Sequence, residues 1–523
     1  MMSADICRAI LEEISRRSPT GRKDIARIKL EVCKRMGAGR VPANSEVLAA
    51  AGPGERERLT ELLRLKPVRS ASGVTVITVM PKPFPCPKPE PCVYCPGGPA
   101  FGTPQSYTGR EPASARAAQH GYDPRLQVRS RIRQLREIGH EVDKVELIIF
   151  GGTLTAYPRD YMEWFVKECL CEIAGRECET IEEAQRAAES AAVRVSDIAM
   201  ETRPDFCRET DVDFMLRLGV TRVELGVQTV YDDVYGLINR GHTVGDVVEA
   251  TRIARDSGMA VVYHLMPGLP GSDFRRDLEM FREVFRNPDF RPDAVKIYPC
   301  LVIKGTRLYE MWREGGFRPM TTEEAVELLA RVKAEIPPWV RIQRIQRDIP
   351  AQLIEAGVRA GNLRELVRKR MEAEGRRCRC IRCREVGHSA VRPEEVELRV
   401  ERYEASGGTE VFLSFEDPAR DVLLAILRLR VPSEGAHRPE LDGAAVVREL
   451  HVYGRLVPVG GRPGPDGWQH RGLGRALLAE AERVAAEELG LRKVAVLAGV
   501  GVREYYLRMG YERDGPYVSK RVG

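Results

Sequence analysis

The sequence predicts a multidomain α/β protein: an incomplete, TIM-like parallel (β/α)6 barrel, then an α+β domain, with a small basic helical domain in front. Three observations predict this fold class. Apolar runs alternate with amphipathic helical stretches between residues 74 and 300, strands precede a helix after residue 396, and residues 1–66 show helical spacing alone. The length of 523 residues suits two to four domains.

The N-terminal region, residues 1–70, combines helical periodicity with positive charge. Ile6, Ile10 and Ile14 recur at helix spacing, and the region holds 15 Lys and Arg against 9 Asp and Glu. A second basic stretch, residues 341–384, holds 13 against 5. Two basic stretches on an otherwise acidic chain favour a polyanionic partner, nucleic acid above all; a solvated basic surface is the alternative.

The predicted barrel occupies residues 71–336. Amphipathic stretches such as 125–138 and 244–257 separate six apolar runs, and a region of about 220 residues suits an incomplete barrel. The predicted strands are 74–80, 145–150, 195–200, 222–227, 260–266 and 294–298.

Polar or glycine-rich residues follow these strands, at the end where such barrels keep their active sites. They are Gly151, Gly152 and Thr153 after the second strand, Glu201 and Arg203 after the third, Gln228 after the fourth, and Lys296 within the sixth. Burying such charges unpaired costs several kcal/mol, so they indicate a ligand in the barrel mouth. Plain turns and structural ion pairs are the alternatives.

The first strand leads into a loop with three cysteines, Cys86, Cys92 and Cys95, among prolines that exclude a helix or a central strand. Clusters held by protein alone normally take four thiolates, so three predict a [4Fe-4S] cluster with one iron left open. A structural zinc loop or unrelated thiols are the alternatives. The segment resembles the cluster loop of radical-SAM enzymes, in which S-adenosylmethionine (SAM) binds the open iron, although the first gap here is five residues rather than three.

In radical-SAM enzymes a Gly-Gly pair contacts SAM. The resemblance assigns this role to Gly151 and Gly152, with Thr153 replacing the usual acidic residue. The groups best placed to bind the ribose and carboxylate of SAM are then Glu201, Arg203, Gln228 and Lys296. Lys296 is also assigned a catalytic role.

A second cysteine trio, Cys378, Cys380 and Cys383, lies in a basic linker over residues 337–394. A structural zinc ion takes four ligands, so we predict zinc with a fourth ligand from elsewhere, His388 being the nearest candidate. Free thiols are the alternative. Upstream, arginines at every third position from 341 to 347 predict a helical or turned basic ridge.

Residues 395–523 form the predicted α+β domain. The predicted strands are 396–400, 410–415, 423–429, 444–459 and 493–497, and the helices are 471–488 and 502–509. Gln469, Arg471, Gly472, Leu473 and Gly474 open the first helix, where backbone N–H groups can cradle a diphosphate.

This order of elements resembles the acetyl-CoA-binding GNAT acetyltransferases. In that fold a pair like Tyr505 and Tyr506 lines the thioester and pantetheine, so both are assigned a catalytic role. The alternative is that these tyrosines fill the core.

A radical-SAM core fused to a GNAT domain resembles one family over essentially the whole chain: the catalytic subunits of Elongator, which are tRNA wobble-uridine acetyltransferases. The motifs that carry the resemblance are Cys-Val-Tyr-Cys-Pro-Gly-Gly (92–98), Gln-Ser-Tyr-Thr-Gly (105–109), Glu-Thr-Arg-Pro-Asp (201–205), Asn-Arg-Gly-His-Thr-Val (239–244), Gln-Arg-Asp-Ile-Pro (346–350), Gly-Asn-Leu-Arg-Glu-Leu (361–366) and His-Val-Tyr-Gly (451–454).

The resemblance implies that Cys86, Cys92 and Cys95 hold the cluster that cleaves SAM, and that the resulting radical takes hydrogen from the methyl group of acetyl-CoA. The carbon radical adds to C5 of the wobble uridine, and thioester hydrolysis leaves a carboxymethyl group. The acetyl-CoA contacts it implies are Lys144, Leu450, His451, Val452, Gly472, Leu473, Gly474 and Tyr505. Both basic regions would hold the tRNA anticodon arm, and an electron donor is required. A homodimer and accessory subunits stay open.

Two other functions stay open at this level. A protein-lysine acetyltransferase would use the GNAT domain alone, with Glu449 as the local candidate base. A non-catalytic tRNA-binding scaffold would have no use for the first cysteine trio.

No apolar run approaches the ~20 residues of a membrane span and no signal-peptide core begins the chain, so we predict a cytoplasmic protein without a membrane partner.

Overall fold

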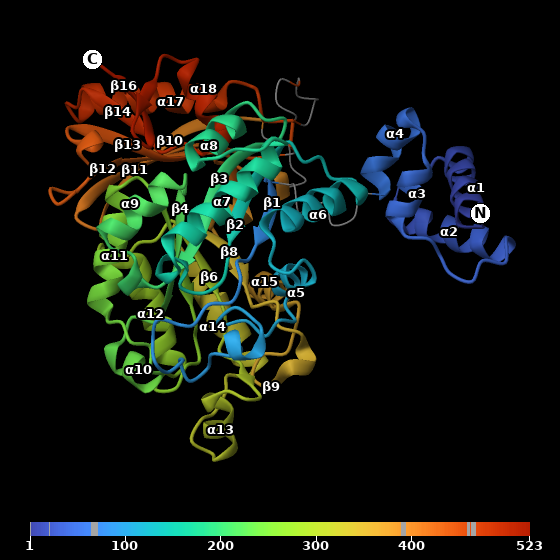
Figure 1. Cartoon of the computed structure of the whole chain (residues 1–523), viewed down its shortest axis with the longest axis horizontal. Coiled ribbons are helices and arrows are strands. Elements are labelled where there is room, and N and C mark those ends of the chain that lie inside the picture. Colours follow the sequence, from blue (N-terminus) through green and yellow to red (C-terminus); the bar gives the residue numbers. More distant parts are fainter. Residues whose placement is uncertain are drawn as a thin grey trace.

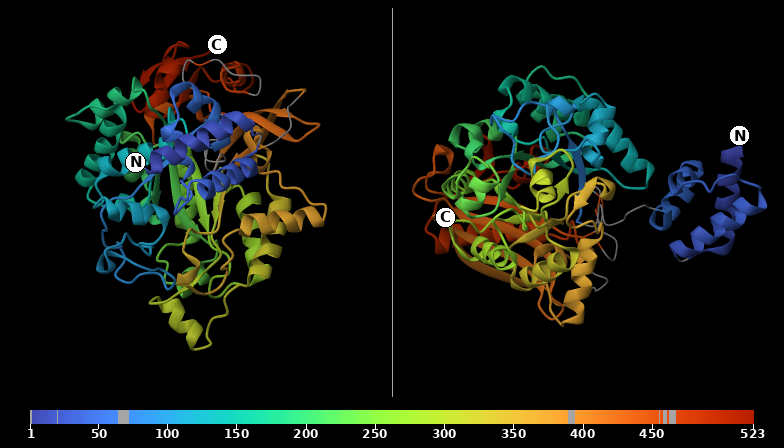
Figure 2. Two further views of the ribbon diagram at one scale, coloured as in Figure 1. Left: turned by 90° about the vertical axis from the view of Figure 1, so that its right-hand side faces the viewer. Right: turned by 90° about the horizontal axis from the view of Figure 1, so that it is seen from below.

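The computed structural model describes residues 2–19, 21–63, 72–388, 394–454, 456–457, 461 and 467–523. The N-terminal helices confirm the helical periodicity of that region. They are α1 (Met2–Arg17), α2 (Arg22–Arg35), α3 (Asn44–Ala50) and α4 (Pro53–Leu63). Ile10, Ile14 and Val32 are fully or almost fully buried in their common core. This bundle projects to one side of the body of the molecule, where α3 contacts the helix Pro124–Glu137 (Figures 1 and 2).

A seven-stranded parallel sheet forms the centre of the body, in the order β1-β2-β3-β4-β5-β6-β8. Its strands are β1 (Thr75–Val79), β2 (Lys144–Ile149), β3 (Arg194–Thr202), β4 (Arg222–Gln228), β5 (Ala260–Leu265), β6 (Ala294–Ile297) and β8 (Arg341–Ile345). The sheet curls into a half-barrel whose outer face is covered by helices (Figure 1). The six predicted strands are therefore confirmed.

The seventh strand, β8, corrects one expectation. We expected a helical or turned ridge from the spacing of the arginines, but residues 341–345 pair in parallel with β6. Val340, Ile342 and Ile345 are buried, and burying them at the sheet edge outweighs the three-residue spacing of the arginines. The sheet thus extends beyond residue 336, where we set the end of the barrel.

Ten of the helices in this part of the described chain connect the strands in the crossover pattern that parallel pairing requires, and the last two follow β8. They are α5 (Pro112–Gln119), α6 (Pro124–Glu137), α7 (Arg159–Ala174), α8 (Ile181–Glu189), α9 (Glu209–Arg217), α10 (Asp232–Leu237), α11 (Val244–Asp256), α12 (Phe274–Arg286), α13 (Arg307–Arg313), α14 (Thr322–Glu335), α15 (Leu363–Ala373) and α16 (Ile381–Arg384). Two short strands, β7 (Val302–Ile303) and β9 (Ile354–Ala356), pair with each other in an antiparallel arrangement, separate from the main sheet.

The inner face of the half-barrel carries charges that pair with one another. Arg222 pairs with Glu146 and Asp197, and Lys296 pairs with the fully buried Glu224. Opposite charges in contact offset much of the cost of removing them from water, which lets a polar barrel interior stay folded.

The C-terminal domain is a second seven-stranded sheet, in the order β10-β11-β12-β13-β14-β16-β15. Its elements are β10 (Glu397–Ala405), β11 (Gly408–Asp417), β12 (Val422–Val431), β13 (Ala444–Val452), α17 (Leu473–Arg483), β14 (Lys493–Val496), α18 (Arg503–Leu507), β15 (Glu512–Asp514) and β16 (Tyr517–Arg521). The predicted α+β order is confirmed.

Two boundaries in this domain differ from the prediction. The strand expected over 444–459 ends at Val452, and residues 455 and 458–459 lie outside the described part. The helix expected over 471–488 starts after Gly472, which has a positive φ of 88° and so does not continue a helix. Beyond Arg483 it continues as a π-helix over Val484–Glu488.

The C-terminal sheet packs against the amino ends of the barrel strands (Figure 1). Gly499 and Gly501 lie against the backbone of residues 194–197 at the start of β3, where an added Cβ would collide with main-chain atoms. A buried ion network joins the domains: Arg448 on β13 holds Asp293 before β6 at 2.7 Å and Glu410 on β11 at 2.7 Å. The two domains therefore meet in a tight, charged interface.

Candidate functional site

A cavity of about 460 Å³ lies at the carboxyl ends of the barrel strands and contains the first cysteine trio. Cys86, Cys92 and Cys95 come from the proline-rich loop after β1. The structure brings them together with six of the residues predicted to bind SAM: Gly151, Gly152, Thr153, Glu201, Arg203 and Gln228. The carboxyl ends of several strands thus build one site, as the spacing of these residues predicted.

The thiols of this trio lie in different surroundings. The Arg240 Nη1 atom lies 3.7 Å from the buried Cys92 Sγ, and Lys88 Nζ lies 3.8 Å from it. Burial raises the pKa of Cys92, but the Arg240 and Lys88 charges outweigh it and lower that pKa below its ordinary value. Burial raises the pKa of Cys95, whose sulfur accepts a hydrogen bond from Gln105 at 3.1 Å.

Glu201 is the polar centre of this cavity. Its Oε2 accepts hydrogen bonds from the Gly151 and Gly152 N–H groups, both at 3.3 Å, and from the Tyr107 hydroxyl at 3.0 Å. Gly152 has a φ of 91°, a conformation that favours glycine. The Gly-Gly pair therefore presents its backbone to the cavity.

The residues around the trio fit an iron–sulfur cluster with SAM. Three sulfurs surround open space, and two buried polar atoms in the cavity lining, Gln228 Oε1 and Arg203 Nη1, have no hydrogen-bond partner among the described residues. Leaving buried polar atoms unpaired is costly, so their presence indicates a polar ligand that completes them.

Lys296, to which we assigned SAM binding and catalysis, does not line this cavity. Its ammonium group pairs with Glu224 and lies 4.5 Å from the centre of the Phe150 ring. His264 bridges Glu224, at 2.7 Å, to Glu201, at 3.8 Å. Lys296 is therefore connected to Glu201 in this cavity only through Glu224 and His264. The Lys296 side chain itself lines a second cavity.

That second cavity, of about 1510 Å³, extends from the C-terminal domain along the inner face of the half-barrel. Its lining includes the residues assigned to acetyl-CoA, from both domains: Lys144, Leu450, His451, Val452, Gln469, Gly472, Leu473, Gly474, Tyr505 and Tyr506. Arg471 lies beside them, with its guanidinium 5.0 Å from the centre of the Trp468 ring.

Gln469 links the elements that meet there. Its Oε1 accepts hydrogen bonds from Lys144 Nζ at 2.9 Å and from the Val457 N–H at 3.0 Å, and its Nε2 donates to the Val452 carbonyl at 3.1 Å. Burial lowers the pKa of Lys144 to about 8. Lys144 belongs to β2 of the barrel, so both domains contribute to this part of the cavity.

The two tyrosines differ. Tyr505 is 41% exposed. Its hydroxyl lies close to Gly474: a Cβ atom added to that glycine would be 3.2 Å from the hydroxyl oxygen. Tyr506 is buried in the hydrophobic core of the domain and its ring contacts those of Tyr505 and Tyr511. Tyr505 therefore faces the glycine-rich turn, while Tyr506 has the surroundings of a core residue.

The two cavities adjoin inside the barrel. Four residues line both of them: Thr78, Arg131, Phe150 and Arg344. We call these the junction residues. The cavity with the first cysteine trio and the cavity with the residues assigned to acetyl-CoA therefore lie next to each other, with these four side chains between them.

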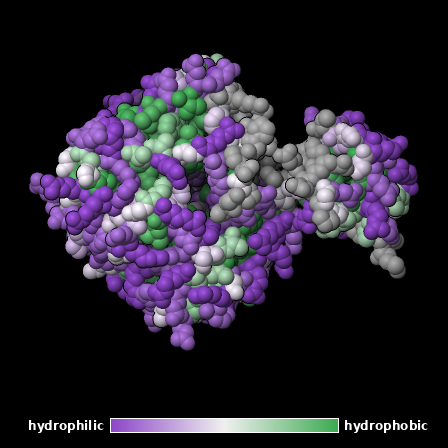
Figure 3. All heavy atoms as spheres, turned by 90° about the horizontal axis from the view of Figure 1, so that it is seen from above, coloured by the Kyte–Doolittle hydropathy of each residue, from purple (hydrophilic) through white to green (hydrophobic). Residues whose placement is uncertain are grey.

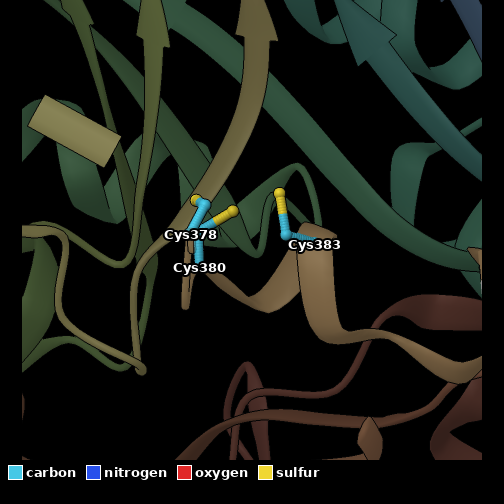
Figure 4. Close-up of side chains that lie close together, drawn as sticks. All are labelled: Cys378, Cys380 and Cys383. Atoms are coloured by element: carbon cyan, nitrogen blue, oxygen red, sulfur yellow. The ribbon is translucent and has the colours of Figure 1, made fainter. Parts of the chain in front are cut away.

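The second cysteine trio is packed much more tightly. Among the described residues, Cys378, Cys380 and Cys383 are the one group of His, Cys, Asp or Glu donors whose ligand atoms all lie within 4.8 Å of one another (Figure 4). Thiolates bound to one zinc ion at ~2.3 Å lie this close together, so the trio fits zinc. Lys333 Nζ lies 3.5 Å from Cys383 Sγ. The side chain of His388, our candidate for the fourth ligand, lies outside the described residues.

Several residues of the site went unassigned in the sequence. They are Lys88, Gln105, Tyr107, Arg240, His264 and the junction residues. Gln105 and Tyr107 lie inside motif 105–109 and Arg240 inside motif 239–244, so those motifs contained a usable signal. The remaining residues, Lys88, His264 and the junction residues, have no local sequence signal, because only the pairing of the strands brings them to the site.

The curled parallel half-barrel and its cysteine loop define a radical SAM enzyme. The family model described as "Radical SAM superfamily" matches residues 86–284, that of the "Radical_SAM C-terminal domain" residues 292–373, and that of the "ELP3 N-terminal domain" residues 3–71.

Relatives that match the whole length of the chain show which radical SAM family it belongs to. It is 50% identical to "tRNA uridine(34) acetyltransferase" of Methanocaldococcus jannaschii, over 98% of this chain and 97% of that one. It is 47% identical to "Elongator complex protein 3" of Homo sapiens, over 95% and 93%. The chain belongs to the family of tRNA uridine(34) acetyltransferases and Elongator complex protein 3.

A solved structure agrees with this placement. The archaeal Methanocaldococcus infernus Elp3 with an N-terminal deletion superposes with a TM-score of 0.77 at 48% identity, covering 86% of this chain and all of that one.

The face of the body in Figure 3 is mainly hydrophilic, and within the described residues no helix has the length and apolar character needed to cross a membrane.

Proposed function

We propose that the protein forms a carboxymethyl group at C5 of the wobble uridine of tRNA, from acetyl-CoA, by radical SAM chemistry. The observation that carries the proposal is the junction inside the barrel: the cavity with the first cysteine trio adjoins the cavity with the acetyl-CoA residues at Thr78, Arg131, Phe150 and Arg344. A reaction that joins the acetyl methyl carbon to a base needs both cofactors to act in one space.

In the smaller cavity, Cys86, Cys92 and Cys95 would hold a [4Fe-4S] cluster, which with SAM supplies a carbon-centred oxidant when bound. The chain's own residues orient the cofactor. Glu201 and the backbone of the Gly-Gly pair offer hydrogen-bonding groups, and Gln228 and Arg203 contribute the unpaired atoms described above.

In the larger cavity, the N-terminus of α17 would bind the diphosphate of acetyl-CoA. Gly472 and Gly474 leave backbone N–H groups accessible at the positive end of that helix. Lys144 adds a positive charge from the barrel, next to Gln469. Tyr505 lies beside the glycine-rich turn, where the thioester arm would pass.

The larger cavity also has the charge expected of an RNA site. Its lining contains 11 Arg and 2 Lys against 5 Asp and Glu. Two of these cations, Arg364 and Arg382, donate to the carbonyl oxygens of Ile342 and Gln343 rather than to a carboxylate. Burial lowers the pKa of both, to about 10 for Arg382, so a phosphate group nearby would stabilise their charges. We assign the tRNA anticodon arm to this surface.

The second cysteine trio has a structural role in this proposal. With zinc bound, Cys378, Cys380 and Cys383 would fasten α16 and the basic linker beside β8. No observation favours the lysine acetyltransferase alternative: Glu449, its candidate base, accepts a hydrogen bond from Arg428 at 2.7 Å in an ion pair, and that partner helps to keep the pKa of Glu449 below its ordinary value.

The test is anaerobic reconstitution with iron and sulfide, followed by dithionite, SAM, acetyl-CoA and an unmodified tRNA. Nucleosides are then digested and analysed by mass. We expect carboxymethyluridine from the wild type, and none from Cys92→Ala or Gly472→Glu. Arg286→Gln, an exposed change on α12 outside both cavities, is the matched control. SAM cleavage without any modified uridine would contradict the substrate, and intact SAM beside a fully loaded cluster would contradict the radical chemistry.

A further inference from the structure

His451 is a histidine that β13 directs into the larger cavity. Its neighbours Leu450 and Val452 pack against the core beneath α17. Successive side chains of a strand point to opposite faces, so His451 faces the barrel. It lines the same cavity as Gly472, Gly474 and Tyr505, to which we assign acetyl-CoA.

The tautomer of His451 follows from one contact. Its Nε2 lies 2.7 Å from the carbonyl oxygen of Ser72, which can only accept a hydrogen bond, so Nε2 carries the proton. Burial lowers the pKa of His451 below its ordinary value, and the ring is therefore neutral near pH 7 with a lone pair on Nδ1. Among the described residues Nδ1 has no hydrogen-bond partner.

Two contacts hold the ring of His451 in place. It stacks on Tyr453 with the ring centres 4.3 Å apart and the planes at 23°. The Ser72 carbonyl fixes the opposite edge. A base held in one orientation loses little freedom when a water molecule binds to it, which is the arrangement that general-base catalysis requires.

The other acceptors in the lining of this cavity are already neutralised by cations. Glu449 pairs with Arg428, Glu146 and Asp197 with Arg222, Asp293 with Arg448, and Glu504 with Arg508. His470 donates from Nδ1 to the Gly461 carbonyl at 3.0 Å, and its Nε2 faces Lys144 Nζ at 3.5 Å. His451 is thus the base of this lining that has no hydrogen bond or ion pair to a cation among the described residues, although the charge of Arg341 adds to the lowering of its pKa.

We propose that His451 is the general base for hydrolysis of the thioester, an assignment that rests on the proposed function. Nδ1 takes one proton from a water molecule while the water oxygen attacks the thioester carbonyl carbon. The C–S bond then breaks, the electron pair leaves with the CoA sulfur, and that sulfur takes the proton. One water is consumed, a carboxylic acid and a thiol form, and no oxidation takes place.

The variant His451→Gln separates this role from a structural one. A glutamine Nε2 can still donate to the Ser72 carbonyl, but glutamine has no basic nitrogen. With reconstituted enzyme, acetyl-CoA, SAM, dithionite and tRNA, we measure free CoA, 5′-deoxyadenosine and acetyl-CoA affinity. CoA release should fall at least ~100-fold, the usual contribution of a general base. SAM cleavage should stay within about twofold, and CoA release is compared at saturating acetyl-CoA because His451 also lines the acetyl-CoA cavity, so the loss should appear in the rate rather than in the Kd.

Chemical rescue provides a second, independent readout. The His451→Ala variant should lose CoA release in the same way and regain at least ~10-fold when imidazole is added, because a free base can fill the vacant position. His437→Gln is the matched control, since His437 pairs with Asp213 and lines neither cavity.

Three results would overturn the assignment. They are CoA release within threefold of wild type in His451→Gln, no effect of imidazole on His451→Ala, and loss of acetyl-CoA binding in both variants. A wild-type protein that binds no acetyl-CoA would instead overturn the proposed function, and this assignment with it.

Discussion

The two cysteine trios contain the same three ligands and differ in how the chain spaces them. Cys86, Cys92 and Cys95 are separated by five and two residues, on a loop that prolines hold extended. Cys378, Cys380 and Cys383 are separated by one and two, at the start of α16. The first trio lines a cavity of about 460 Å³, whereas all three sulfurs of the second lie within 4.8 Å.

Each trio also has a buried cation beside one thiol. Arg240 lies 3.7 Å from Cys92, and Lys333 lies 3.5 Å from Cys383. Charge compensation is therefore common to both trios and does not distinguish them. The space between the thiols does: the first trio lines a cavity with room for a cluster, and the second trio leaves room for no more than a single ion.

Removing one thiol of the first trio should have the largest effect on activity. Cys92→Ala leaves two ligands for the cluster, so SAM cleavage should fall more than ~10³-fold, which corresponds to about 4 kcal/mol of activation free energy. The measurement is 5′-deoxyadenosine formation together with iron and zinc content. Zinc should remain at its wild-type level; a parallel loss of zinc would show that the two trios are not independent.

Removing one thiol of the second trio should act on stability. Cys380 is fully buried at the N-terminal end of α16, and Cys380→Ala should abolish zinc binding and lower the free energy of unfolding by on the order of 3 kcal/mol. Thermal unfolding and metal analysis measure this. Cys7→Ala, a buried cysteine in the N-terminal bundle, controls for loss of a thiol alone. If Cys380→Ala retained zinc, the second trio would not be the zinc site.

The buried cation of the second trio should have a smaller effect. Lys333→Met keeps the length of the side chain but removes the charge next to three thiolates, so zinc affinity should fall about 10-fold. Competition with a chelator measures the change. Lys369→Met, on the exposed side of α15, is the control. Equal affinities for the two variants would mean that the Lys333 charge does not act on the metal.

The cation of the first trio should give the smallest change. Arg240→Met removes a hydrogen-bond donor and a positive charge beside Cys92, and this should move the reduction potential of the cluster to more negative values, by tens of millivolts in order of magnitude. A spectroscopic redox titration of the reconstituted protein measures it. A shift to more positive potential would contradict the electrostatic role given to Arg240.

Sequence reasoning found the parts of the site that depend on local pattern. The cysteine loop, the Gly-Gly pair and Glu201 follow strands, and strand ends are readable from apolar runs. Lys296 has the same local signal and, like Glu201, is the last residue but one of its strand, yet it pairs with Glu224 on β4, two strands away in the sheet. The arginines of residues 341–347 misled us in the same way, because β6 recruits their segment as β8.

The sequence by itself determined which chemistries this protein contains: two cysteine trios, a glycine pair after a strand and a glycine-rich turn before a helix are all encoded within a few neighbouring residues. Tertiary structure alone decided that the first trio, the glycine pair and the glycine-rich turn line two adjoining cavities. The junction residues come from β1, α6, the end of β2 and β8, and the Ser72 carbonyl orients His451, 379 residues further along the chain. Such contacts depend on which strands pair and on how the C-terminal sheet packs against the half-barrel, and no local spacing encodes either.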